Sequence, residues 1–199
     1  TFPVWVQEHV DLSLGAFEVP VPWYQSVGPL FSIIGVPVLF ALWGWQARRR
    51  GEPGDLGKIG IGASLAACAN LILVAAILVT AGDNIHPLWP FLYCGTLGIA
   101  FLYYWPTLLA LVSRAAPASV NATMMGVCFL TLFVGNNVIG WLGGFYEPLG
   151  PLRFWLLHAG IGATGAVLVL LFGRMLRRSL DGAVRDEELR PGAETVEVE

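Results

Sequence analysis

Long stretches without a charged side chain dominate the sequence. Each holds about 20 residues or more without Asp, Glu, Lys or Arg, and about 20 helical residues at a rise of 1.5 Å cross a hydrocarbon layer of about 30 Å. A helix is also the only open-chain structure that satisfies every backbone amide in lipid. The pattern therefore predicts five transmembrane helices, over Gly28–Ala47, Ile59–Gly82, Leu88–Ser113, Ser119–Tyr146 and Phe154–Gly173.

The overall composition supports lipid as the solvent of most of the chain. Of 199 residues, 13% are charged and 56% are hydrophobic, the mean hydropathy is +0.67 and the net charge is −3. Soluble domains carry roughly 25% charged residues, and nucleic-acid partners call for a basic surface that this chain lacks. We therefore expect an all-α polytopic membrane protein that contacts the lipid bilayer and no nucleic acid.

The distribution of Lys and Arg predicts the topology. Ten of the 11 basic residues lie on one side of the predicted spans, and Arg153 lies on the other. By the positive-inside rule the C-terminus is cytoplasmic, in a plasma (inner) membrane. We expect 1–24 to be an external segment, the end of a preceding helix plus a loop, 25–178 to be the five-helix bundle, and 179–199 to be a disordered cytoplasmic tail. The odd number of spans and the missing initiator Met favour a fragment.

The sequence offers little redox, metal or cofactor chemistry. The three cysteines, Cys68, Cys94 and Cys128, fall singly on three spans, so we interpret them as buried packing residues and expect no metal and no cofactor. His158 lies about one turn into the last span, where it either takes part in proton movement or gating or makes a structural hydrogen bond. Tryptophan and tyrosine near span ends, Trp5 and Trp155 among them, are typical of anchors at the headgroup level.

Proline, glycine and small polar residues interrupt the spans. Proline inside a span removes a backbone hydrogen bond and bends the helix, and glycine lets a neighbouring helix approach. Cys128, Thr131 and Gly135 form a small, mildly polar stripe that either lines a cavity or packs against another helix. The predicted bending or packing positions are Pro29, Pro37, Pro106, Gly126, Asn136 and Gly140.

These residues resemble the proton-dependent oligopeptide transporters of the major facilitator superfamily. The similar segments are Trp23–Phe31 with Pro37 and Trp43, then Pro106, Ala116-Pro117, Met124–Leu130, Gly135-Asn136 and Gly140. The resemblance implies helices eight to twelve of a secondary transporter. It also implies that the missing N-terminal helices, a peptide or other small-molecule substrate, and protons are the partners of this chain.

The chain departs from that family at three substrate contacts. Gly28 stands where the family usually has Asn, Phe101 where it has a Glu that engages the peptide amino terminus, and Cys128 where it has Trp. Losing one charge-assisted hydrogen bond costs about 1.5–3 kcal/mol, so the substrate preference is expected to differ. The residues predicted to line the substrate cavity are Gly28, Phe101, Tyr104, Cys128 and Thr131.

Two other classes of protein remain as alternatives. A membrane-embedded lipid-modifying enzyme would cluster His, Asp or Glu at a span end, and only Glu147 and His158 come near to such a cluster. A non-transporting membrane assembly subunit would need no cavity. The sequence favours a transporter and not an enzyme.

Overall fold

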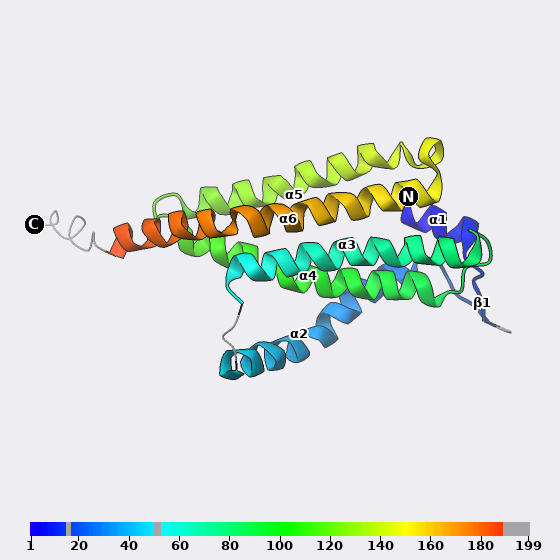
Figure 1. Ribbon diagram of the computed structural model, residues 1–199, viewed down its shortest axis with the longest axis horizontal. Coiled ribbons are helices and arrows are strands. Elements are labelled where there is room, and N and C mark those ends of the chain that lie inside the picture. The colour runs from blue at the N-terminus through cyan, green and yellow to red at the C-terminus, as the bar shows by residue number, and fades with distance from the viewer. Residues whose placement is uncertain (15–16, 50–52, 189–199) are drawn as a thin grey trace, which may run out of the picture.

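The computed structural model describes residues 1–14, 17–49 and 53–188. A short helix and a two-stranded antiparallel hairpin precede five long helices (Figure 1). The elements are α1 (Phe2–His9), β1 (Ser13–Leu14), β2 (Phe17–Glu18), α2 (Trp23–Arg49), α3 (Asp55–Thr80), α4 (Leu88–Ala115), α5 (Asn121–Gly143) and α6 (Tyr146–Glu188).

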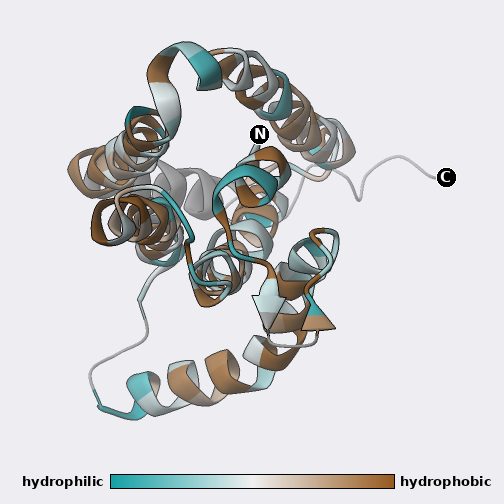
Figure 2. Ribbon diagram, turned by 90° about the vertical axis from the view of Figure 1, so that its right-hand side faces the viewer, coloured by the Kyte–Doolittle hydropathy of each residue, from teal (hydrophilic) through white to brown (hydrophobic). Residues whose placement is uncertain are grey.

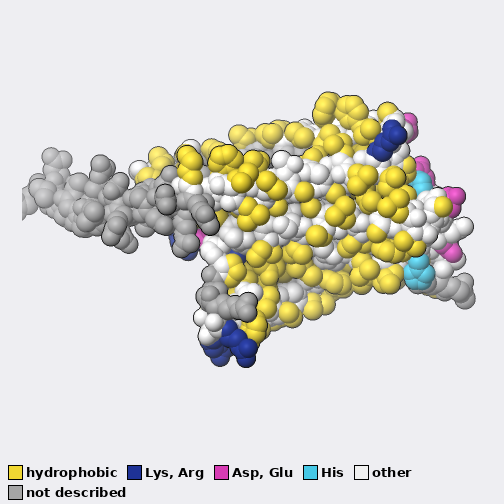
Figure 3. All heavy atoms as spheres, viewed as in Figure 1, with side chains coloured by type: hydrophobic (Ala, Val, Ile, Leu, Met, Phe, Trp, Pro, Cys, Tyr) yellow, Lys and Arg dark blue, Asp and Glu magenta, His cyan; other side chains and the backbone are white. Residues whose placement is uncertain are grey.

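The five long helices confirm the five predicted spans. Each has the length and apolarity needed to cross a membrane, as α2, α3, α4, α5 and residues Tyr146–Gly173 of α6. Hydrophobic residues run along these helices (Figure 2), and hydrophobic side chains cover most of the face seen in Figure 3. The protein is an integral membrane protein.

The helix α3 lies at the centre of the packing, between α4 and α6 (Figure 1). Glycine permits both close approaches. A Cβ atom at Gly62 would lie 3.0 Å from the carbonyl oxygen of Ala100 on α4, and one at Gly162 on α6 would lie 3.0 Å from the backbone nitrogen of Ala67. The helix α2 packs on the other side of α4, while α5 makes fewer contacts, mainly with α4. Only 6% of the most apolar stretch of α2, and 6% of that of α5, is buried inside the protein, against 39% for α3. These two helices are therefore the most exposed of the five.

One end of the bundle, which we call the α1 end, is closed by α1 and the loops. The segment after α1 pairs in parallel with the α3–α4 loop at Val10 and Ile85. Two backbone hydrogen bonds hold this pair: the Asp11 N–H donates to the Ile85 carbonyl over 3.0 Å, and the Ile85 N–H donates to the His9 carbonyl over 2.9 Å. The sequence did not predict the β1–β2 hairpin, which lies within residues 1–24.

Aromatic side chains fill the space beneath α1. Trp5 is fully buried, and its ring lies 5.9 Å from that of Trp155 on α6 in an edge-to-face arrangement. Phe2 lies 4.8 Å from Tyr93 of α4, so α1 is bound to two membrane helices through its rings. Trp5 and Trp155 are therefore core residues, and their prediction as headgroup anchors is wrong, because docking of α1 covers both.

The opposite end, which we call the basic end, carries Arg48, Arg49, Lys58 and Arg114. Figure 3 shows Lys and Arg gathered where α2 ends, while His and acidic side chains gather at the α1 end. At the basic end α6 continues as a helix to Glu188, so its backbone is helical over 179–188, where a disordered tail was expected. Half of these ten residues are strong helix formers, namely Leu180, Ala183, Arg185, Glu187 and Glu188, and they favour continuation of the helix beyond the apolar span.

Candidate functional site

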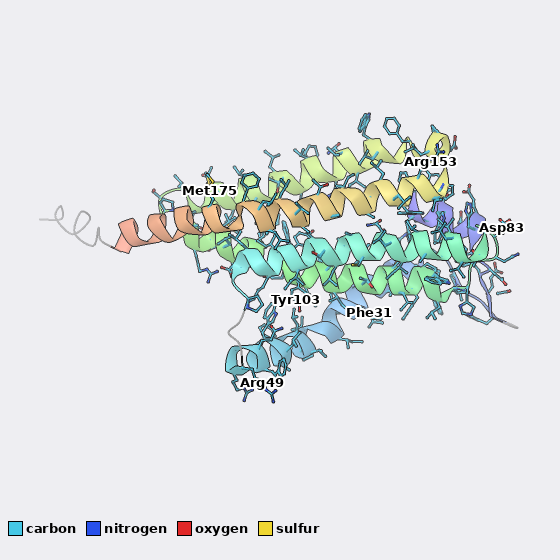
Figure 4. The ribbon with its side chains drawn as sticks, in the orientation of Figure 1. Phe31, Arg49, Asp83, Tyr103, Arg153 and Met175 are labelled. Atoms are coloured by element: carbon cyan, nitrogen blue, oxygen red, sulfur yellow. The ribbon has the colours of Figure 1, made fainter. Side chains whose placement is uncertain are left out.

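Gly28, a predicted cavity residue, lies where α2 crosses α4. A Cβ atom at Gly98 would lie 2.3 Å from the Gly28 carbonyl oxygen, so the two backbones are in direct contact. The hydroxyl of Ser32, one turn along α2, donates to the Gly98 carbonyl over 2.9 Å. Phe31 lies in the same interface, where its ring would be 2.9 Å from a Cβ atom at Gly95 (Figure 4). Gly28 therefore packs helices together, with α4 as its direct neighbour.

A cluster of aromatic rings on α4 contains two further predicted residues. Phe101 is 42% exposed, and its ring lies 5.8 Å from Tyr104 and 6.4 Å from Trp105. Trp105 in turn meets Phe129 of α5 edge-to-face at 5.6 Å. This cluster links α4 to α5 and presents ring faces and edges, with the Tyr104 hydroxyl as a polar group.

Cys128 and Thr131 lie one turn apart on α5. Cys128 is buried, whereas Thr131 is exposed and its hydroxyl donates to the Cys128 carbonyl over 2.6 Å. The Thr131 side chain is thus bonded to its own helix. Cys128 is adjacent in sequence to Phe129, which contacts the α4 ring cluster, so the structure brings this part of α5 to Phe101 and Tyr104.

The predicted bending and packing residues lie on open surfaces. Pro29, Pro37 and Pro106 are exposed within α2 and α4. Beyond the adjacent residues and the backbone of α5 itself, no described atom lies within 4 Å of a Cβ atom placed at Gly126 or at Gly140. Asn136 is exposed as well, so this face of α5 meets no other described helix.

An apolar groove of about 930 Å³ separates the first turns of α2 and α4 at the α1 end. Pro29 lines it together with Trp23, Leu30, Ile33 and Phe91. The groove has room for apolar groups and little polar surface for recognising charged ones.

A second cavity, of about 680 Å³, lies at the basic end between α3, α4 and α6. Gly57 and Gly60 of α3 are among its lining residues, and Ser64 of the same helix adds a hydroxyl. Asp55, also in the lining, forms an ion pair with Arg114 of α4. This pair joins the first turn of α3 to the last turn of α4.

The titratable residues of the spans are dispersed. His158 is half-buried, and its Nδ1 lies 3.0 Å from the Phe154 carbonyl, while its ring lies 4.3 Å from that of Phe154. Among the described residues, no three His, Cys, Asp or Glu side chains gather in a way that could hold a metal ion. Cys94 and Cys128 are buried as predicted, but Cys68 is exposed, so its prediction as a packing residue is wrong; it lies in the lining of the second cavity.

Sequence reasoning missed a contact between α2, α3 and α4 at the basic end. The Lys58 ammonium of α3 lies 3.9 Å from the centre of the Trp43 ring on α2, and Tyr103 of α4 meets the same indole edge-to-face at 5.9 Å (Figure 4). The one feature of the sequence that could have indicated this contact is Lys58, a lone cation at the start of an apolar stretch.

Comparison with known proteins gives the family. The model of the POT family matches residues 1–147, which is most of the chain. The chain belongs to the POT family. A peptide transporter of Yersinia enterocolitica, YePEPT, is 28% identical over 178 residues, covering 86% of this chain and 35% of that protein. The uncharacterized transporter YclF of Bacillus subtilis is 27% identical, covering 91% of this chain and 36% of that protein.

Solved structures of POT transporters have the same fold. A peptide transporter POT in complex with alafosfalin matches with a TM-score of 0.81 at 21% identity, over 89% of this chain and 36% of that one. A POT transporter in complex with 5-aminolevulinic acid matches with a TM-score of 0.77 at 24% identity, over 85% of this chain and 35% of that one. The chain thus spans a little over a third of the length of these POT proteins.

Proposed function

We propose that this chain forms helices eight to twelve, in the C-terminal half, of a proton-coupled peptide symporter. The observation that carries the proposal is the fold match over 89% of the chain, with a TM-score of 0.81, to a peptide transporter POT that holds alafosfalin. Membership of the POT family supports it. In such a transporter two helical halves rock about a substrate site near the bilayer midplane, and this chain supplies one wall of that site.

The basic end faces the cytoplasm in this proposal. Arg48, Arg49, Lys58 and Arg114 lie there, and Arg153 lies at the other end, which is the asymmetry expected from the positive-inside rule. The C-terminus is then cytoplasmic, in a plasma (inner) membrane, and α1 belongs to the external end of helix seven.

Phe101 is the residue that changes the substrate preference. The family resemblance implies a carboxylate there, which would bind the amino terminus of a peptide, whereas Phe101 offers an exposed ring beside Tyr104 and Trp105. A ring binds apolar or aromatic groups by stacking and contributes no charge-assisted hydrogen bond. We therefore propose that the substrates of this transporter carry an apolar or aromatic group, which the rings on α4 bind.

Coupling to protons relies on other helices. His158 is the one histidine at membrane depth in the described structure, and its Nδ1 is engaged by the Phe154 carbonyl. Because symporters need ionisable groups in the transport path, the main coupling residues belong to the N-terminal helices.

The proposal is tested by uptake into proteoliposomes. The full-length protein is reconstituted, and uptake of a labelled dipeptide is measured with and without an inward proton gradient. We expect gradient-driven uptake; its absence for every dipeptide in a diverse panel would overturn the proposal.

Phe101→Glu tests the cavity assignment within the same assay. Restoring a carboxylate is expected to tighten dipeptide binding by roughly 10–150-fold, which corresponds to about 1.5–3 kcal/mol. Gly28→Asn is expected to act in the same direction, because a Cβ atom at Gly28 has ordinary contact with the Cys94 carbonyl at 3.5 Å. Phe101→Gln, which has the same length as Glu without the charge, is the control. Unchanged dipeptide uptake in both Phe101→Glu and Gly28→Asn would show that neither residue lines the cavity.

A further inference from the structure

The last part of α2, residues 38–49, which we call the α2 arm, stands apart from the other helices at the basic end. Figure 1 shows α2 change direction along its length, and Figure 2 shows the arm separated from the bundle. Val38 and Phe40 are 65% and 66% exposed, whereas Leu39 between them is buried. Pro37 precedes the arm, and its missing N–H weakens the helix at that point.

A single indole ring contacts both neighbouring helices from the arm. The Lys58 ammonium of α3 lies over the face of Trp43 at 3.9 Å, and Tyr103 of α4 approaches its edge with an interplanar angle of 80°. Lys58 and Tyr103 are 9% and 8% exposed, so both residues that contact Trp43 are largely removed from solvent. Cation–π attraction is strongest when both groups are desolvated.

The same arrangement leaves two polar atoms of the arm without partners. Trp43 Nε1 and Gln46 Oε1 are buried, and no hydrogen-bond partner reaches either of them within the described structure. A buried polar atom without a hydrogen bond destabilises the conformation that buries it. The contacts of Trp43 with Lys58 and Tyr103 therefore hold the arm in a position that leaves two polar atoms without hydrogen bonds. That cost disappears when the arm moves outward and both atoms meet water or headgroups.

We propose that Lys58 and Trp43 form a latch that holds the α2 arm against α3 and α4, and that the arm opens about Pro37 during the transport cycle. Lys58 acts here as a positioning residue: it touches Trp43 and sets the place of the arm. The role in a cycle rests on the proposed transport function, whereas the existence of the latch does not. Opening breaks the contacts of Trp43 with Lys58 and Tyr103 and lets two buried polar atoms form hydrogen bonds, which offsets part of the free energy that opening costs.

The latch is tested by the distance between spin labels on the arm and on α4. Cysteines are placed at Ala47 and Ser113, both exposed, in full-length protein whose native cysteines, the three of this chain included, have been replaced. Lys58→Met removes the charge and keeps the chain length. It is expected to add a population several ångströms longer and to shift the closed-to-open ratio about 30-fold, which is about 2 kcal/mol at 1.4 kcal/mol per tenfold change.

A second cation–π contact provides the matched control. Arg49 lies over Trp45 at 5.2 Å, but both residues belong to α2, so this contact joins no other helix. Arg49→Met is expected to leave the label distance unchanged, and Lys58→Arg, which keeps a cation for the ring, to retain the closed distance. Identical distance distributions for Lys58→Met, Arg49→Met and the unmodified protein would overturn the latch.

A double variant guards against a folding defect at Lys58. Trp43→Leu removes the ring that contacts both Lys58 and Tyr103, so it is expected to open the arm at least as far as Lys58→Met does, and adding Lys58→Met to Trp43→Leu is expected to open it no further. Additive opening would show that the two residues act separately and would overturn the latch.

In the uptake assay Lys58→Met is expected to lower the maximal rate several-fold at unchanged KM. A label shift in a protein that takes up no dipeptide would refute the proposed function and leave the latch intact.

Discussion

Gly98 of α4 and Gly28 of α2 touch through their backbones, and this contact sets the spacing of the two helices. A Cβ atom at Gly98 would lie 2.3 Å from the Gly28 carbonyl oxygen, a separation that backbone atoms cannot tolerate. The helices would have to move apart, and the hydrogen bond from Ser32 to the Gly98 carbonyl would be lost with them.

Gly98→Ala is therefore expected to destabilise the protein by about 1–3 kcal/mol, the usual cost of overpacking. Thermal unfolding of the purified protein in detergent measures this as a lower Tm. Gly135→Ala is the control, because no described atom outside the adjacent residues and the backbone of α5 lies within 4 Å of a Cβ atom there, and alanine favours helix over glycine by about 1 kcal/mol. Equal stability of the two variants would contradict the close contact.

Trp5→Ala is expected to be the most destabilising change at the α1 end. Trp5 is fully buried against Trp155, and truncation of a buried Trp costs about 3–5 kcal/mol. The helix α1 should detach, which limited proteolysis near residue 10 would detect together with a lower Tm. Trp141, which is 67% exposed, gives the comparison, since Trp141→Ala should change stability by less than about 0.5 kcal/mol. A protease-resistant α1 in the Trp5 variant would refute this account.

The ion pair of Asp55 with Arg114 is expected to contribute little by itself. The Arg114 side chain is 63% exposed, and exposed pairs typically contribute about 0.2–1 kcal/mol. Arg114→Gln should therefore lower the Tm slightly, and the difference should shrink as salt is added. The exchange of charges in Asp55→Arg with Arg114→Asp should recover the loss. A large effect of Arg114→Gln that persists at high salt would show a role beyond this pair.

Asp11, which lies outside the membrane-spanning helices, is expected to make the stability of the protein depend on pH. The Ser13 hydroxyl and the Ser13 backbone N–H both donate to its carboxylate, which lowers the pKa of Asp11 below its ordinary value. The stabilising effect is present above the ordinary Asp pKa of about 3.9 and is lost as the pH falls through the lowered value. NMR titration of labelled Asp11 should show that Ser13→Ala raises its pKa. An unchanged titration curve would mean that the hydrogen bond from the Ser13 hydroxyl is absent in solution.

Spans and family were predictable from the sequence because both depend on local patterns. Charge-free stretches of sufficient length specify a membrane helix whatever its neighbours are, and all five were confirmed. The family followed from short motifs around Pro37, Pro106 and Gly140, and the family match confirmed it.

The contacts between helices could not be predicted in the same way. Gly98 and Gly140 look alike in sequence, yet Gly98 meets another backbone and Gly140 meets open space, because contact depends on which face a neighbour covers. The pairing of Trp43 with Lys58 likewise requires the chain to reverse between α2 and α3. Burial of Trp5 depends on α1 folding back onto α6, which no local pattern reports.

The pairing of Val10 with Ile85 makes the two ends of the bundle mechanically unequal. Backbone hydrogen bonds hold the α1 end, whereas the side-chain contacts of Trp43 with Lys58 and Tyr103 join the α2 arm to α3 and α4 at the basic end. The α1 end beside Ile85 is therefore expected to keep its place while the α2 arm moves. A strain from a bound substrate or from lateral pressure in the bilayer is then expected to displace the end of α2 more than the α1 end.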